Sequence, residues 1–209
     1  MIWVVGLGPG DPGLLTLRGA EVLKRAAVVY VPVSSSSEAG LAERVVLRIA
    51  PGVEVRRLEF RMGGATRDDL RRTAAELDRA GEAVYALLGD PTLYSTFAKV
   101  KPYLNSPWSY VPGVTSVTSC AARIGRDVAS GDESIAIVPA TRSELLRVAV
   151  ELFDTVVVVK ANRNVDGVNA LLSRFGGVAV RRCFLDGEQF SKMIGWEDYF
   201  TTVYIWRGR

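Results

Sequence analysis

The stretch "ALLGDPTLYSTF" (residues 86–97) runs from an apolar segment directly into a Gly-Asp-Pro turn. Two similar corners occur in the chain, "IWVVGLGPGDPG" (residues 2–13) and "SYVPGVTS" (residues 109–116). In each corner a short apolar run, which predicts a buried strand, ends at the glycine and proline typical of tight turns. An acidic side chain stands in two of the corners, Asp11 in the first and Asp90 in the Gly-Asp-Pro turn.

The rest of the chain repeats one pattern, in which an apolar strand leads through a turn into an amphipathic helix. Helical spacing of apolar residues predicts helices near 16–26, 41–49, 66–81, 113–124, 145–152 and 165–175. Short apolar or alternating runs predict strands near 2–5, 27–33, 53–55, 83–88, 109–111, 134–138 and 155–160. Near the C-terminus, the segments 178–184 and 202–206 are expected to pair antiparallel.

Strands that alternate with helices need crossover connections, so the sequence predicts an α/β protein with largely parallel sheets. Its 209 residues are enough to bury a substantial core. We expect two α/β lobes, residues 1–111 and 112–209, the second of which ends in an antiparallel hairpin. Ligands of such sheets lie beyond the carboxyl ends of the strands. A ligand held by all three corners is therefore the simplest hypothesis, and three purely structural turns are the alternative.

The composition excludes several kinds of site. The chain has no His, so a catalytic zinc site and Ser-His or Cys-His nucleophile pairs are not expected. We predict no protein-bound metal; one that takes part would arrive with the substrate. The two cysteines, Cys120 and Cys183, fit a reducing cytoplasm as buried free thiols.

Charge and hydropathy restrict the partners. No apolar run reaches the roughly 18 residues of a membrane span, and a core-like strand rather than a basic leader opens the chain. A cytoplasmic protein without a membrane partner is therefore expected. The net charge of +3 is mild and no Lys/Arg-rich run appears, so a nucleic-acid partner is not implied. A small polyanionic substrate fits equally well.

The first corner contains a nominal G-x-G-x-x-G pattern at residues 8–13, but its chemistry is wrong for a dinucleotide. Pro9 and Pro12 remove two backbone N–H donors, and Asp11 places negative charge where pyrophosphate would lie. The ribose-binding acid expected about 20 residues further on is missing. A ligand without phosphate but with a positive centre, such as S-adenosylmethionine, suits this loop better.

Five stretches carry a resemblance to a known family: "VGLGPGDPGLLTLRGAEVLKRA" (5–26), "LLGDPTLYSTF" (87–97), "YVPGVTSVTSCAARIG" (110–125), "GDESIAIVPA" (131–140) and "VVVVKANRN" (156–164). With them the chain resembles the tetrapyrrole (corrin/porphyrin) methylase family over nearly its whole length. The resemblance implies a two-lobed α/β homodimer that binds S-adenosylmethionine in the cleft between its lobes. The segments after Asp90 and Val111 are similar to those of members that methylate carbon 20 of precorrin-2, or of its cobalt-containing counterpart, on the route to cobalamin.

The resemblance also implies site residues. Carried over by position, the cofactor contacts are Pro9, Leu88, Gly89, Asp90, Leu93, Thr115, Ser116, Ala140, Lys160 and Asp186. The substrate carries carboxylates, which arginine forks bind well, and the candidates for this role are Arg18, Arg61, Arg67 and Arg123. For each of these arginines a solvated surface position is the alternative.

Methyl transfer to carbon 20 must be followed by loss of a proton from that carbon. Without His, the candidate proton acceptors are Asp11, Tyr94 and water. Each residue also has a purely structural interpretation. Asp11 would cap a helix that starts at Pro12, and Tyr94 would be a half-buried ring whose hydroxyl is hydrogen-bonded. Two other functions stay open: a family member with a different acceptor (another ring carbon, diphthine or ribosomal RNA), and a non-catalytic tetrapyrrole-binding module.

Overall fold

The computed structural model describes residues 1–34, 40–60 and 65–208. The chain divides into two compact units, Met1–Thr115 and Ser116–Arg209. The boundary expected from the sequence, between residues 111 and 112, lies just before this division. Within the described residues, no helix combines the length and the apolarity that a bilayer crossing requires.

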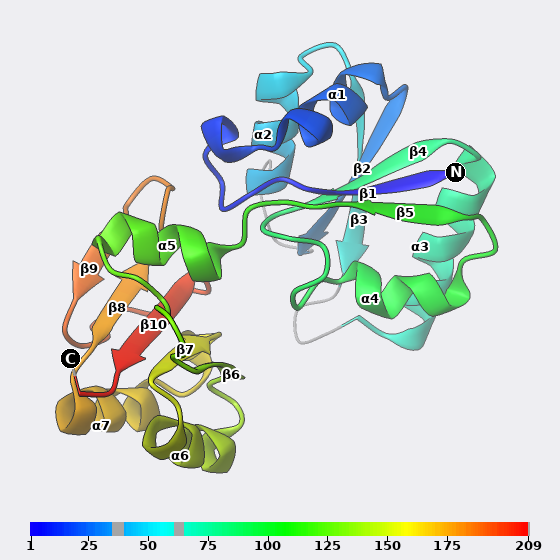
Figure 1. Cartoon of the computed structure of the whole chain (residues 1–209). Helices are drawn as coiled ribbons and strands as arrows, with labels where there is room; N and C mark the ends of the chain where they lie inside the picture. The colour runs from blue at the N-terminus through cyan, green and yellow to red at the C-terminus, as the bar shows by residue number, and fades with distance from the viewer. Residues whose placement is uncertain (35–39, 61–64, 209) are drawn as a thin grey trace. The chain divides into compact units, whose positions relative to one another are not determined.

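The first unit is built on a five-stranded parallel sheet of order β3-β2-β4-β1-β5 (Figure 1). Its strands are β1 (Ile2–Gly6), β2 (Val28–Ser34), β3 (Glu54–Phe60), β4 (Ala83–Leu87) and β5 (Trp108–Val111). In the register, Gly6 lies opposite Leu87 and Val5 lies opposite Val111. The carboxyl ends of β4, β1 and β5 therefore coincide, as the three corners require.

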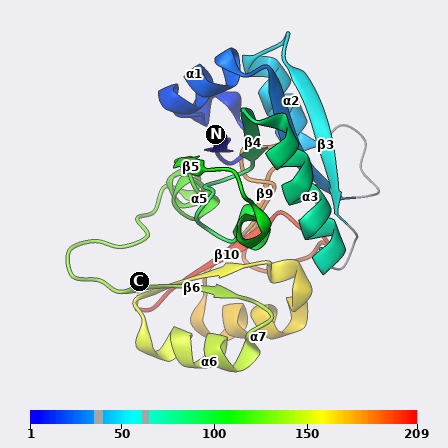
Figure 2. The same cartoon turned by 90° about the vertical axis from the view of Figure 1, so that its right-hand side faces the viewer.

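Helices cover both faces of this sheet, as Figure 2 also shows. They are α1 (Leu17–Arg25), α2 (Leu41–Ile49), α3 (Arg67–Ala80) and α4 (Phe97–Val100), with two 3₁₀ turns, η1 (Pro12–Leu14) and η2 (Lys101–Tyr103). Alternate strand residues point to opposite faces. Val4 thus packs in the cluster that includes α3 and α4, and Val5 in the cluster that includes α1 and α2.

The ends of α3 follow from its sequence. The Thr66 hydroxyl accepts the Asp69 N–H, and the Asp69 carboxylate accepts the Thr66 N–H, which completes the predicted capping box. Gly81, with a φ of 70°, closes the helix at its other end.

The second unit contains a mixed sheet of order β6-β7-β10-β8-β9. The strands are β6 (Ile135–Pro139), β7 (Thr155–Val159), β8 (Val178–Arg181), β9 (Gln189–Ser191) and β10 (Thr201–Trp206). β6 and β7 are parallel, whereas the pairings of β10 with β7 and β8, and of β8 with β9, are antiparallel. The predicted antiparallel pairing of the C-terminal strands is confirmed, and β9 extends it.

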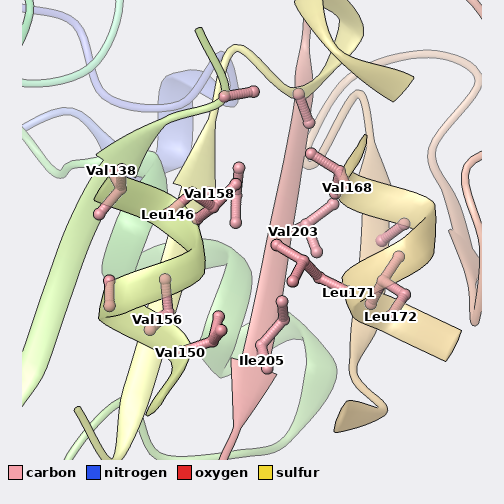
Figure 3. Packing of buried hydrophobic residues seen from close by; sticks show 14 of the residues in the cluster. Val138, Leu146, Val150, Val156, Val158, Val168, Leu171, Leu172, Val203 and Ile205 are labelled. Carbon is pink, nitrogen blue, oxygen red and sulfur yellow. The ribbon is translucent and has the colours of Figure 1, made fainter. Parts of the chain in front are cut away.

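Helices cover this second sheet as well. They are α5 (Ser116–Ile124), α6 (Ser143–Leu152) and α7 (Val165–Phe175), with the 3₁₀ turn η3 (Ala161–Arg163). Figure 3 shows side chains of α6 and α7, such as Leu146 and Leu171, packed on Val158 and Val203 of the sheet. On β10, the neighbouring Tyr204 donates hydrogen bonds from its hydroxyl to the first carbonyls of α5.

Some elements differ from the sequence prediction. The strand expected over 178–184 ends at Arg181, because Arg182 and Phe184 adopt left-handed backbone conformations that a strand does not contain (φ 48° and 61°). The one-turn helix α4 and the three-residue strand β9 are too short to produce a periodic signal.

Two buried tyrosines in the first unit differ in how their hydroxyls are bound. Tyr30 on β2 and Tyr85 on β4 are opposite each other in the sheet, and both are fully buried. The Tyr30 hydroxyl accepts a hydrogen bond from Arg56 Nη1 at 3.2 Å. Among the described residues, the Tyr85 hydroxyl has no hydrogen-bond partner, and burial raises its pKa above the usual range.

We expect Tyr85→Phe to leave the free energy of unfolding unchanged or to raise it by about 1 kcal/mol, because a buried hydroxyl without a partner is removed. The matched control Tyr30→Phe should lower it by about 1 kcal/mol, since Arg56 loses an acceptor. Urea unfolding followed by circular dichroism measures both changes. Equal destabilisation by the two substitutions would contradict this assignment of the hydroxyls.

Candidate active site

The three corners of the first unit meet in the structure. The first corner (residues 6–13) and the second (89–91) are joined by a pair of backbone hydrogen bonds between Gly8 and Gly89. The Gly8 N–H donates to the Gly89 carbonyl at 3.2 Å, and the Gly89 N–H donates to the Gly8 carbonyl at 2.7 Å. An isolated antiparallel bridge therefore joins the first two corners beyond the ends of the parallel strands β1 and β4.

Glycine is required where the third corner (residues 112–116) joins the other two. A Cβ atom on Gly113 would lie 2.3 Å from the Gly89 carbonyl oxygen, and one on Gly6 would lie 2.6 Å from that same oxygen. Real Cβ atoms do not approach other atoms so closely. The three backbones pack directly on one another, which only residues without a side chain permit.

Asp90 connects the second corner to the third. Its Oδ2 accepts the Gly113 N–H at 3.0 Å, and its Oδ1 accepts the Thr92 N–H at 2.8 Å and the Thr92 hydroxyl. Partial burial opposes ionisation of this carboxyl group, but the hydrogen bonds from Thr92 and Gly113 outweigh it and hold the pKa of Asp90 below its usual value. Asp90 is thus an ionised bridge whose two oxygens both bind the protein.

A second side chain joins the first and third corners. The Thr16 hydroxyl donates to the Pro112 carbonyl at 3.2 Å and accepts the Gly19 N–H at 3.1 Å, as the N-cap of α1. Sequence reasoning did not single out Thr16 or Thr92. The available signals are a threonine before the apolar periodicity of α1, and the Asp-Pro-Thr order typical of an Asx turn.

The two candidate proton acceptors lie on the first two corner loops. Asp11 is exposed, and its Oδ1 accepts the Gly13 N–H at 2.8 Å, so that it caps η1 with Pro12 as the first residue. The capping role of Asp11 is therefore confirmed. Tyr94 is 49% exposed and has a left-handed backbone with φ 53°. The catalytic roles of both residues stay predictions.

The backbone of the second corner is open where a ligand would approach. Gly89 has φ 74°, and in the described part of the chain nothing lies within 4 Å of the position that a Cβ atom would take. Leu88 and Leu93 are half-buried on either side of it in the sequence, and Pro9 of the first corner is buried. These four candidate cofactor contacts belong to the converging loops.

Three further candidate cofactor contacts are Thr115 in the first unit and Ala140 and Lys160 in the second. Thr115 is half-buried at the end of the third corner. In the second unit, Ala140 and Lys160 follow the paired ends of β6 and β7, and the Ala140 N–H donates to the carbonyl of Val159 at 2.9 Å. Lys160 has a left-handed backbone (φ 55°) where η3 begins.

Ser116 and Asp186 complete the predicted cofactor set. The Ser116 carbonyl, at the first residue of α5, accepts the Tyr204 hydroxyl at 3.0 Å. Asp186 is exposed in the turn between β8 and β9, where its carbonyl lies 3.5 Å from Arg182 Nη1. Their contacts with a cofactor stay predictions.

Three of the candidate arginines, Arg18, Arg67 and Arg123, are exposed, and two of these are paired. Arg18 forms a 3.3 Å ion pair with Glu21, and Arg123 forms a 2.9 Å pair with Glu188. Arg67 is the first residue of α3, whereas Arg61 lies outside the described residues. The Arg18–Glu21 pair is exposed on both sides, and exposed ion pairs contribute little stability, whereas Glu188 is largely buried.

Comparison with known proteins identifies similar sequences and folds. The family model described as Tetrapyrrole (Corrin/Porphyrin) Methylases matches residues 1–185. The chain is 30% identical over 181 residues to "Probable cobalt-precorrin-2 C(20)-methyltransferase" of Methanocaldococcus jannaschii, covering 83% of this chain and 77% of that protein. It is 28% identical over 203 residues to "Cobalt-precorrin-2 C(20)-methyltransferase" of Salmonella typhimurium, covering 90% and 86%.

A solved structure shares the fold over almost the entire chain. It is the uroporphyrin-III C-methyl transferase from Thermus thermophilus, complexed with S-adenyl homocysteine. The TM-score is 0.74 at 23% sequence identity, and the match covers 98% of this chain and 91% of that one. The predicted two-lobed α/β fold with an antiparallel C-terminal end is confirmed.

Replacing Gly113 by Ala should destabilise the first unit by about 1–3 kcal/mol, because the added methyl group collides with the Gly89 carbonyl. Gly52→Ala is the matched control, since nothing described lies within 4 Å of its Cβ position. Thermal unfolding of the two variants checks the expectation. If both variants had the melting temperature of the wild type, the close approach of the three corners would be contradicted.

Asp90→Asn should lower the free energy of unfolding by about 1–3 kcal/mol at pH 7, since the charged acceptor of the Thr92 and Gly113 hydrogen bonds is lost. The depressed pKa of Asp90 stabilises the fold above the unfolded value of about 3.9, and this contribution disappears as the pH falls through the folded value. The difference between variant and wild type should therefore shrink below about pH 4. Urea titrations across this pH range measure it, with the exposed Asp132→Asn as the control; a difference that stays constant with pH would contradict the bridge.

Proposed function

The chain belongs to the tetrapyrrole (corrin/porphyrin) methylases, and on this premise we propose that it transfers a methyl group from S-adenosylmethionine to carbon 20 of precorrin-2 or cobalt-precorrin-2 in cobalamin biosynthesis. The names of the two curated relatives support this choice of acceptor. The structural observation that carries the proposal is the convergence of three glycine-containing corners at one edge of a parallel sheet, with the backbone of Gly89 open.

The chemistry of the corners fits the proposed methyl donor. Pro9 and Pro12 lack N–H groups, and Asp11 and Asp90 contribute carboxylates, so the loops offer mainly acceptors. Such a surface favours the sulfonium and ammonium groups of S-adenosylmethionine over a phosphate. The proposed contacts are Pro9, Leu88, Gly89, Asp90, Leu93 and Thr115 of the first unit, with Ser116, Ala140, Lys160 and Asp186 of the second.

The methyl donor supplies an electrophilic methyl group on a sulfonium whose leaving group is neutral. The chain therefore needs no oxyanion hole, and its main task is to hold methyl group and acceptor carbon in line. Alignment of two reactants can contribute about 7–11 kcal/mol. The corner loops, fixed by the Gly8–Gly89 pairing and by Asp90, supply a rigid support for one of the two reactants.

The acceptor would be bound through its carboxylates by Arg18, Arg61, Arg67 and Arg123, and Asp11, Tyr94 or water would accept the proton from carbon 20. A homodimer in the cytoplasm, without a protein-bound metal, is part of the same proposal and rests on the family resemblance and the composition. Methylation at another ring carbon is the alternative within the family.

Incubation with S-adenosylmethionine and either metal-free or cobalt-loaded precorrin-2 tests the function. We expect S-adenosylhomocysteine and a product that has gained one methyl group, which NMR places on carbon 20. Methylation at another carbon would overturn the choice of acceptor position. No turnover with either acceptor, although S-adenosylmethionine binds, would favour a non-catalytic binding module.

Two substitutions separate the candidate proton acceptors. Loss of the acting group should lower kcat by about 10²–10⁴-fold, the usual contribution of a general base. We therefore measure single-turnover rates for Asp11→Asn, which keeps an oxygen to cap Gly13, and for Tyr94→Phe, which keeps the ring. If both variants retain wild-type rates, water accepts the proton and neither residue is catalytic.

A further inference from the structure

The second unit contains one pair of parallel strands whose carboxyl ends lie side by side. β6 and β7 are paired in register up to Pro139 and Val159, and the Ala140 N–H then donates to the Val159 carbonyl at 2.9 Å. The segments that follow are residues 140–142, which lead into α6, and residues 160–164, which lead into α7. Ligands of α/β sheets lie beyond the carboxyl ends of parallel strands, so a ligand of the second unit is expected at these two loops.

One side chain, that of Asn164, ties the two loops together. Its Nδ2 donates to the Ala140 carbonyl at 3.1 Å and to the Ser143 hydroxyl oxygen at 3.2 Å. Both acceptors follow β6, whereas Asn164 ends the loop that follows β7. A single amide group therefore holds the two loops at a fixed separation.

The oxygen of the same amide fixes the start of α7. Asn164 Oδ1 accepts the Gly167 N–H at 3.3 Å, which makes Asn164 the N-cap of this helix. A Cβ atom on Gly167 would lie 2.6 Å from both Nδ2 and Oδ1 of Asn164, so glycine at this position makes room for the amide. The amide is hydrogen-bonded through both of its polar atoms, and the protein thereby fixes its orientation.

The loop after β7 has a backbone conformation that needs such support. Lys160 has φ 55°, a left-handed value that is uncommon for a residue with a side chain. Conformations of this kind persist only where the surroundings fix them, and they are frequent at functional sites. The Arg163 N–H donates to the Lys160 carbonyl at 3.0 Å, and the Asn164 N–H donates to the Ala161 carbonyl at 3.2 Å. Asn164 thus closes the strained turn with its backbone and joins it to the neighbouring loop with its side chain.

The same turn contains a buried acceptor that the protein does not pair. Asn162 is half-buried, and in the described part of the chain its Oδ1 is buried and has no hydrogen-bond partner. A buried acceptor without a partner costs free energy, which a ligand with an N–H or O–H donor would recover. This atom belongs to a residue two positions from Lys160, one of the proposed cofactor contacts. The turn therefore has a group that favours a bound ligand.

We propose that Asn164 is a positioning residue for S-adenosylmethionine, because its amide holds the loop of Ala140 and the loop of Lys160 in the arrangement that binds the cofactor. This inference rests on the proposed function, since both contacts belong to it. Asn164 acts through the Ala140 carbonyl and the Lys160 turn and not by contact with the cofactor. Asp90 has the corresponding role in the first unit, where its carboxylate joins the second corner to the third.

Two substitutions separate the bridging role of Asn164 from its capping role. Asn164→Ser keeps a hydroxyl oxygen that can cap α7 but is too short to reach Ala140. Asn164→Asp keeps the length and the capping oxygen but, as a carboxylate at neutral pH, cannot donate to the Ala140 carbonyl. Isothermal titration of the full chain with S-adenosylhomocysteine measures the binding. In both variants we expect the dissociation constant to rise by about tenfold, the effect of one lost hydrogen bond.

Asn169→Ser is the matched control on the same helix. The Asn169 Nδ2 donates to the Ile194 carbonyl at 3.0 Å, and its Oδ1 accepts the Ile194 N–H at 2.8 Å. These bonds lead to the segment between β9 and β10 and not to the loop after β6. Asn164→Ser and Asn169→Ser should both lower the melting temperature by a few degrees, whereas only the change at Asn164 should weaken the binding of S-adenosylhomocysteine.

The outcomes distinguish this inference from the proposed function. Wild-type affinity in both Asn164 variants would reduce Asn164 to a structural role and overturn the inference, while the proposed function would stand. Equal weakening by Asn164→Ser and Asn169→Ser would also overturn it, because a general loosening of the second unit would explain both. A wild type that does not bind S-adenosylhomocysteine would contradict the proposed function, and the inference would fall with it.

Discussion

The contact of backbone with backbone at Gly6, Gly89 and Gly113 is the constraint on which the candidate site of the first unit depends. Parallel strands bring their carboxyl ends to one edge, but ordinary side chains would keep the loops that follow them apart. Glycine at positions 6 and 113 removes that separation, because a Cβ atom at either position would collide with the Gly89 carbonyl oxygen. The Gly8–Gly89 pairing and the Asp90 carboxylate then fix the three loops as one body. The loops then form one edge at which the main chain of Gly89 is open.

In the candidate site, the polar side chains stabilise the loops rather than face an open space. The polar side chains nearest the convergence, Asp90, Thr92 and Thr16, are occupied with hydrogen bonds inside the protein. What the corners leave open is the backbone at Gly89, where no described atom lies within 4 Å of the Cβ position. A methyl transfer that needs alignment rather than acid–base power is compatible with a site of this kind.

Much of the fold was predictable, because the strands are apolar and the helices are strongly amphipathic. The corners were also recognisable, since glycine and proline at strand ends have few alternative explanations. What the sequence did not reveal depends on contacts between distant residues: the bond from Gly113 to Asp90 and the clash that excludes a side chain at Gly6. Short elements such as β9 were not predicted for another reason: three residues are too few to show a hydrophobic periodicity.

The charge at the corners limits what the first unit can bind. Hydrogen bonds keep Asp90 ionised well below neutral pH, and Asp11 lies on the loop to which the Gly89 backbone pairs. With two prolines that donate no N–H, this edge attracts cations and is unfavourable for phosphate or carboxylate groups. In the function that we propose, the acidic groups of the tetrapyrrole are bound away from the corners, by exposed arginines such as Arg18 and Arg67, and the positive sulfonium is bound at the corners. With the positive sulfonium at one place and the negative carboxylates at another, the methyl donor and the tetrapyrrole would be oriented relative to each other before any side chain takes part in the chemistry.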